Sequence, residues 1–130
     1  MKMYRTLLLT TLLFSLLSCV DDKPKIIPEP TKEELLVKER QVISVSSNDM
    51  AVDHSGFTID FKSDGNFSFN TPGISGLPPS GKWEFSTNNN IKLDGTIDLH
   101  VGILNANKFV FTFNSTSHKD TNVETEFTME

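Results

Sequence analysis

Residues 57–70 read FTIDFKSDGNFSFN, and this stretch decides the fold. Its large apolar residues stand at odd positions and alternate with polar ones, the period of two that is typical of a β-strand with one buried face. Between the two runs, Asp64-Gly65 readily supplies the positive φ angles of a tight hairpin turn. The stretch therefore predicts two antiparallel strands joined by a short turn.

The same alternation continues on both sides of this hairpin. Further strands are predicted at residues 42–45, 81–85, 91–93, 97–101, 109–113 and 123–129, with turns or loops at 71–80, 88–90, 94–95, 105–107 and 115–122. One apolar and one polar face fit an antiparallel sheet with a solvated side. We predict an all-β fold, an antiparallel up-and-down meander of about eight strands, closed into a barrel so that no sheet edge remains.

One short helix is predicted ahead of the strands. Thr31-Lys32-Glu33-Glu34 fits a capping box, in which the Thr31 hydroxyl accepts from the Glu34 amide and the Glu34 side chain reaches back. Leu35 and Leu36 supply a small apolar face. We expect a helix over about residues 31–39, docked across one end of the barrel because it is too short to be stable alone.

The strand motifs also carry a resemblance. FKSDGNF at 61–67 followed by GKWEF at 81–85 resembles the lipocalin-like domains of small Bacteroidetes lipoproteins, as do EELL at 33–36 and FVF at 109–111. The resemblance implies a lipocalin-like β-barrel over residues 31–130, and it implies fold more than activity. Such domains often begin their first strand with Gly-x-Trp, where this chain has Lys38-Glu39-Arg40.

The N-terminus has the pattern of an export signal. Lys2 and Arg5 precede an uncharged run at 6–17, which is too short to cross a hydrocarbon core of about 30 Å. LLSC at 16–19 resembles the lipobox of bacterial lipoproteins, which implies a signal peptide at 1–18 and a lipid on Cys19. The alternatives are an ordinary secretory signal with an incidental cysteine, or an N-terminal membrane anchor.

A tether is predicted to follow at residues 19–30. VDDKPKIIPEP at 20–30 is rich in proline and charge and cannot bury a core. Asp21 and Asp22 resemble the export signal that follows the lipidated cysteine of surface-exposed Bacteroidetes lipoproteins; the alternative is the start of a solvated tether. We therefore expect an outer-membrane lipoprotein, either displayed at the cell surface or facing the periplasm.

Composition excludes several classes of protein. The chain has 130 residues, with 12 Lys and Arg against 17 Asp and Glu, so its net charge of -5 argues against a nucleic-acid partner. A single cysteine excludes an internal disulfide framework and a multi-cysteine metal site.

The sequence offers little catalytic chemistry. His54, His100 and His118 lack the spacing of metal ligands on one strand. Asp53-His54-Ser55 contains triad residue types, but sequence neighbours point apart. Acidic pairs such as Asp94 with Asp98 fall on the outward face of the predicted strands. We predict no enzyme, no metal and no cofactor.

The apolar interior is the remaining candidate site. The aromatic residues predicted to line a ligand pocket, or else to fill the core, are Phe61, Phe69, Trp83, Phe85, Phe111 and Phe113. The loop at 73–79 could act as a lid, contact a partner or fold back. These features predict a non-catalytic binding module for a small apolar or glycan-type ligand, or for an envelope protein. The alternative is a structural or accessory subunit of an outer-membrane assembly; in both cases the lipid on Cys19 contacts the membrane.

Overall fold

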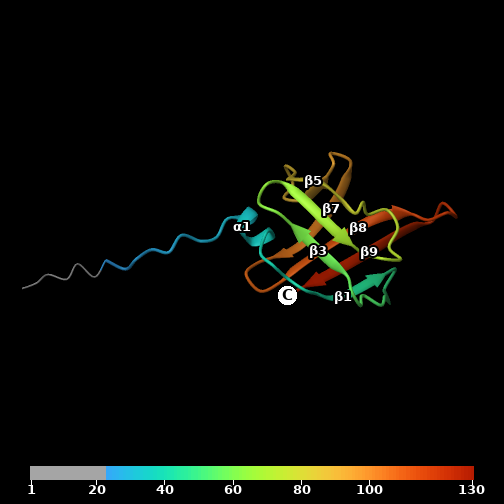
Figure 1. Cartoon of the computed structure of the whole chain (residues 1–130), viewed down its shortest axis with the longest axis horizontal. Coiled ribbons are helices and arrows are strands. Elements are labelled where there is room, and N and C mark those ends of the chain that lie inside the picture. The colour runs from blue at the N-terminus through green and yellow to red at the C-terminus, as the bar shows by residue number, and fades with distance from the viewer. Residues whose placement is uncertain (1–22) are drawn as a thin grey trace, which may run out of the picture.

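The computed structural model describes residues 23–130, which form one antiparallel sheet and one short helix (Figure 1). The predicted signal peptide, Cys19, Asp21 and Asp22 lie outside the described residues. In chain order the elements are α1 (Lys32–Leu36), β1 (Val42–Ser47), β2 (Met50–Ala51), β3 (Thr58–Phe61), β4 (Asn66–Asn70), β5 (Ser80–Phe85), β6 (Ile91–Leu93), β7 (Ile97–Leu104), β8 (Phe109–Thr116) and β9 (Asn122–Met129). The all-β class and the antiparallel meander are therefore confirmed.

The sheet has nine strands in the order β2-β1-β9-β8-β7-β6-β5-β4-β3. From β3 to β9 each strand pairs with the next along the chain, and β1 pairs with β9. The strand that the sequence did not predict is β2, which pairs only Met50 and Ala51 with the end of β1. The turn between β1 and β2 has Asn48 and Asp49 at positive φ. It contains no glycine, the residue whose presence would have indicated such a turn in the sequence.

The sheet is curled into a half-barrel. Across the interior, the Phe57 ring lies 6.4 Å from that of Phe127 on β9, and the Phe61 ring lies 6.1 Å from that of Phe109 on β8. The order of strands ends at β2 on one side and at β3 on the other, and the registers include no pairing between these two edges. The closed barrel expected from the sequence is therefore not confirmed, and the strand count is nine instead of about eight.

The core lies on the concave side of the sheet, where the alternation placed it. It consists of Leu36, Val45, Phe57, Ile59, Phe61, Phe67, Phe69, Ile91, Leu93, Leu99, Phe109, Phe111, Phe113, Phe127 and Met129. The residues of the predicted inward face that remain half-buried are Trp83, Phe85, Ile97, Val101 and Val123. The alternation of apolar and polar side chains along each strand thus decides which face of the sheet is buried.

The helix α1 is shorter than expected and closes one end of the half-barrel. Its capping box is formed, because Thr31 Oγ1 accepts from the Glu34 amide at 3.2 Å and the Thr31 amide donates to Glu34 Oε2 at 2.7 Å. The helix ends at Leu36, which is 2% exposed in the core. Arg40 fixes this end, since its guanidinium donates to the Leu35 carbonyl and to the carbonyl of Asn105.

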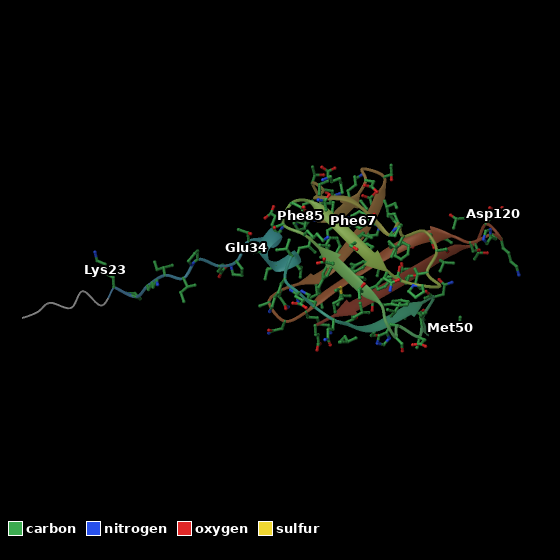
Figure 2. All side chains as sticks on the ribbon, viewed as in Figure 1. Lys23, Glu34, Met50, Phe67, Phe85 and Asp120 are labelled. Atoms are coloured by element: carbon green, nitrogen blue, oxygen red, sulfur yellow. The ribbon has the colours of Figure 1, made fainter. Side chains whose placement is uncertain are left out.

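The long hairpin of β8 and β9 projects from the opposite end. Figure 2 shows Asp120 at its tip, far from Glu34 on the helix, with Met50 marking the β1–β2 hairpin below it. Asp120 has a φ of 52° in this turn. The half-barrel therefore has one end covered by α1 and a second end surrounded by hairpins and by the loop at 71–79.

Candidate functional site

The described part of the predicted tether is extended and exposed. Residues 23–30 have no regular structure and lead away from the half-barrel (Figure 1). Ile26 and Ile27 are 86% and 81% exposed, so this segment makes little contact with the domain. Within residues 23–130, no helix has the length and apolar character needed to cross a membrane.

The six aromatic residues predicted to line a pocket belong to one network of ring contacts. Four of them contact one another directly, and Phe111 and Phe113 join the network through Phe109 and Phe127. Phe61, Phe69, Phe111 and Phe113 are buried, whereas Trp83 and Phe85 are half-buried. The Phe61 ring lies 5.3 Å from the Phe69 ring and 6.0 Å from the Trp83 ring, both edge-on. Edge-on packing is a favourable geometry for aromatic pairs. The rings therefore fill this part of the interior with one another. That the six form a ligand pocket stays a prediction.

The loop at 73–79 folds back over the open end of the half-barrel. Its Ile74 and Leu77 pack against the core. Gly76, at a φ of +92°, comes so close to β8 that a Cβ built on it would lie 2.9 Å from the Ser115 Cβ. The sequence left three roles open for this loop: a lid, a partner contact, or a loop that folds back. Its contacts with the core correspond to the third.

A cleft of about 430 Å³ opens beside this loop, where β7 and β8 diverge. The β7–β8 register runs from Leu104 and Phe109 to His100 and Thr112, and no pairing continues beyond it. The beginning of β7 still pairs with β6, and the end of β8 still pairs with β9. The cleft is lined by Ser75, Gly76, Thr96, Ile97, Asp98, His100, Asn114, Ser115 and Thr116.

Main-chain groups of β7 point into this cleft. In an antiparallel strand, successive residues direct their N–H and C=O groups alternately to the two neighbouring strands. The Val101 amide donates to Asn90 Oδ1, just before β6, so Val101 faces the β6 side. By alternation His100 and Asp98 face β8. His100 has its partner in Thr112, whereas the register pairs no β8 residue with Asp98.

Main-chain groups of β8 point into the cleft from the other side. The Glu124 carbonyl accepts from the Asn48 amide at 2.9 Å, so Glu124 faces β1. Asn114 stands opposite Glu124 on β8. This pair is therefore not hydrogen-bonded across β8 and β9, and Asn114 directs its N–H and C=O toward β7, as Thr116 does two residues on. The two walls thus present strand edges to each other across the cleft.

The surroundings of the cleft carry more acid than base. Asp98 pairs with Lys92 at 3.3 Å on the β6 side. Glu124 and Glu126 lie on the exposed outer face of β9, opposite Asn114 and Thr112. His100 Nδ1 is hydrogen-bonded to the side-chain Nδ2 of Asn90 at 3.2 Å. The cleft is therefore polar, with an acidic border along β9.

A second cleft, of about 360 Å³, lies between residues 37–40 and strand β3. Arg40 contributes to it, and Arg40 Nε and Nη1 are buried without a hydrogen-bond partner. Burial lowers the pKa of Arg40 below its ordinary value. Because the guanidinium already bonds to Leu35 and Asn105, its observed role is to hold α1 against the β7–β8 turn.

The residue types considered for catalysis remain apart. His54, His100 and His118 lie on three different segments, and among residues 23–130 no three metal-ligating side chains cluster closely enough to hold an ion. Hydrogen bonds from the Ser55 amide and hydroxyl to the Asp53 carboxylate lower the pKa of Asp53. Asp53 and Ser55 therefore form a turn in which Ser55 stabilises the ionised carboxylate of Asp53.

The β7–β8 cleft was not predicted from the sequence. Its polar residues appear there as the outward face of two ordinary strands. A weak signal is Gly102, which lies where the β7–β8 register shifts between Val101 and Ile103. Glycine inside a strand often marks such an irregularity.

The comparisons with known proteins add no relative. No protein-family model matches the chain, and no curated protein or solved structure matches it either. The likeness to lipocalin-like lipoproteins thus stays a prediction from the residues quoted above.

Proposed function

We propose that this chain is a lipid-anchored protein of the cell envelope whose half-barrel is a non-catalytic binding module. The observation that carries the binding role is the β7–β8 cleft, a recess with unpaired strand edges on both walls. Exposed polar main chain in a concave surface is suited to holding a ligand or a partner segment. The interior is less suited to holding a ligand than the surface cleft, because its aromatic rings already pack against one another.

The anchor is proposed from the sequence at the N-terminus. The only cysteine of the chain stands at the end of LLSC, and the exposed tether at 23–30 would separate the domain from the lipid. A single acyl chain binds membranes only marginally, so stable anchoring needs the two or three chains of a lipoprotein. Asp21 and Asp22 favour a location at the outer membrane, with the domain either at the cell surface or facing the periplasm.

The closed lipocalin-like barrel is proposed as the finer description of the fold. It is supported by the pairing of β1 with β9, which joins the first and last strands of the domain. Closure would require β3 to pair with the other edge of the sheet, which is formed by β2 and the rest of β1. The proposed binding role does not depend on it, since the cleft lies elsewhere in the sheet.

The anchor is tested by expressing the full chain and its Cys19→Ala variant in a Gram-negative bacterium. The wild-type protein should fractionate with membranes and show an intact mass that includes the lipid. Cys19→Ala should lose the lipid mass and leave the membrane fraction. Ser15→Ala, inside the signal but outside the lipobox, is the matched control and should behave as wild type. A Cys19→Ala protein that stays in membranes without a lipid mass would contradict the anchor.

The binding role is tested by native mass spectrometry of the purified full chain, with and without cell-envelope extract. A binding module should gain a species of defined mass and stoichiometry that dissociates on dilution. The alternative, a structural or accessory subunit, predicts instead a complex that persists through purification and does not exchange. Conversion of an added molecule into a product of different mass would refute the non-catalytic role.

A further inference from the structure

The free strand edges of the β7–β8 cleft define what it can bind. An extended peptide recognises a strand edge by main-chain hydrogen bonds, and its alternate side chains provide the specificity. On β8 the free edge includes Asn114 and Thr116, whose N–H and C=O groups face the cleft. On β7, Asp98 is the one residue of the strand whose N–H and C=O groups face the cleft without a partner on β8. The longer free edge is therefore on β8.

We propose that this cleft binds an extended peptide, which adds a short strand to the free edge of β8 and carries Lys or Arg on its outer face. The inference rests on the proposed binding role and names its site and its partner. The added strand would lie antiparallel to β8 along residues 114–116. It extends a sheet that already pairs β8 with β9 over the same residues.

The charge of the partner follows from the outer face. Side chains of an added strand that point outward would lie next to those of Asp98 and Asn114, with Glu124 beyond them on β9. Asp98 already pairs with Lys92, while Glu124 and Glu126 make no ion pair within the described residues. Opposite charges on neighbouring strands stabilise a sheet, and like charges destabilise it. A basic outer face is therefore complementary and an acidic one is not.

The inward side chains must be small. The floor of the cleft is formed by Ser75 and Gly76, and Gly76 already approaches Ser115 so closely that a Cβ there would lie 2.9 Å from the Ser115 Cβ. Large inward side chains would have to displace this loop, and with it Ile74 and Leu77 from the core. The preferred partner thus alternates small polar residues with Lys or Arg.

The test is an NMR titration of the ¹⁵N-labelled full chain with the peptide acetyl-Thr-Lys-Ser-Lys-Thr-amide. Two matched peptides serve as controls, one with Glu in place of Lys and one with the main-chain amide of the first Lys N-methylated. Residues that pair with Asn114 and Thr116 point their side chains to the same outer face, so it is the Lys residues that direct their N–H groups to β8. The amides of Asn114 and Thr116 should shift on titration. Each control peptide should bind at least about tenfold more weakly, since the first reverses the charge and the second removes a main-chain donor.

Variants of the chain separate the two contributions. Thr116→Pro removes an N–H group at the free edge near the end of β8, where a proline is tolerated because that group has no ladder partner. It should weaken binding of the Lys peptide about tenfold. Glu124→Gln should weaken binding and lower its salt dependence, whereas Glu84→Gln on β5 is the control and should do neither. If Thr116→Pro fails to fold, the N-methylated peptide still tests the main-chain contacts with the unmodified protein.

Four results would overturn the proposal. Equal binding of the N-methylated peptide would mean attraction by charge alone. Shifts confined to residues outside the cleft would place the peptide elsewhere. Cleft amides that shift with protein concentration, together with dimers in light scattering, would mean that a second copy of this chain occupies the cleft. A partner found by native mass spectrometry that Thr116→Pro still binds would leave the proposed function standing and remove only this site.

Discussion

Gly81→Ala is expected to destabilise the fold by about 1.5 kcal/mol, because β5 leaves no room for a side chain at this position. A Cβ on Gly81 would lie 2.7 Å from Asp94 Cγ and in contact with both carboxylate oxygens. The carboxylate cannot simply turn away, since Asp94 Oδ1 accepts from the Lys82 amide at 2.8 Å. The Asp94 amide in turn donates to the Lys82 carbonyl at 2.8 Å, which fixes the backbone as well.

The magnitude follows from the two ways of relieving this contact. If the carboxylate moves, a hydrogen bond to a charged group is lost, at a cost of about 1.5–3 kcal/mol. If the backbone moves, the cost is that of overpacking, about 1–3 kcal/mol. Alanine recovers about 0.4–1 kcal/mol by restricting the unfolded chain. The balance is about 1.5 kcal/mol, or roughly 8 °C in Tm for a domain of this size.

Gly102→Ala is the matched control. Gly102 also lies in a strand, and a Cβ there would meet its nearest atom, the Val110 carbonyl oxygen, at 3.7 Å, an ordinary contact. Urea unfolding followed by circular dichroism should give a stability equal to or slightly above wild type for Gly102→Ala and a clear loss for Gly81→Ala. Asp94→Gly removes the obstructing carboxylate, so adding Gly81→Ala to that variant should cost little.

Two results would refute this reasoning. One is a Gly81→Ala protein as stable as Gly102→Ala. The other is a cost of Gly81→Ala that stays the same in the Asp94→Gly background, because the two positions would then not be coupled.

Three further predictions concern the helix, the core and the turns. Thr31→Ala removes the hydroxyl acceptor of the capping box and should cost about 1 kcal/mol in urea unfolding; exposed Thr87→Ala is the control, and equal effects would argue against the cap. Phe111 stacks on Phe127 at 5.0 Å with an interplanar angle of 8°, so Phe111→Leu should cost about 2 kcal/mol by the same assay, and an unchanged midpoint would count against this packing. Hydrogen bonds from the Asn66 amide and side chain lower the pKa of Asp64, so its contribution to stability is complete above the unfolded-state pKa of about 4 and is lost as the pH falls through the folded-state pKa. Asp64→Asn should therefore show a shallower acid-induced loss of stability across a pH series, whereas parallel curves for the two proteins would contradict the effect.

The local elements were largely predictable because their signals are local. The Asp64-Gly65 and Asp94-Gly95 turns form as predicted, with positive φ at Gly65, Asp94 and Gly95. The capping box at Thr31 forms as well. The helix is shorter than predicted because the Arg40 guanidinium binds the Leu35 carbonyl at its end, a contact that also involves distant Asn105.

The features that were not predicted depend on how strands meet. The turn at Asn48 and Asp49 has no glycine, so the two-residue strand β2 left no clear signal. The sheet edges at β2 and β3 do not pair, although the alternation of apolar residues is the same in an open and in a closed barrel. The β7–β8 cleft exists because the pairing stops at His100 and Thr112, and apart from Gly102 the two strands carry no sequence signal of where they separate.

The sequence by itself determined every strand except β2, which face of those strands is buried, and where most of the chain turns. It could do so because periodicity, turn chemistry and capping act over a few residues. The tertiary structure decided that the meander curls into a half-barrel, that its aromatic residues pack ring against ring, and that a polar cleft opens between β7 and β8. Those outcomes depend on register and on contacts between residues far apart in the chain, which side-chain periodicity does not encode.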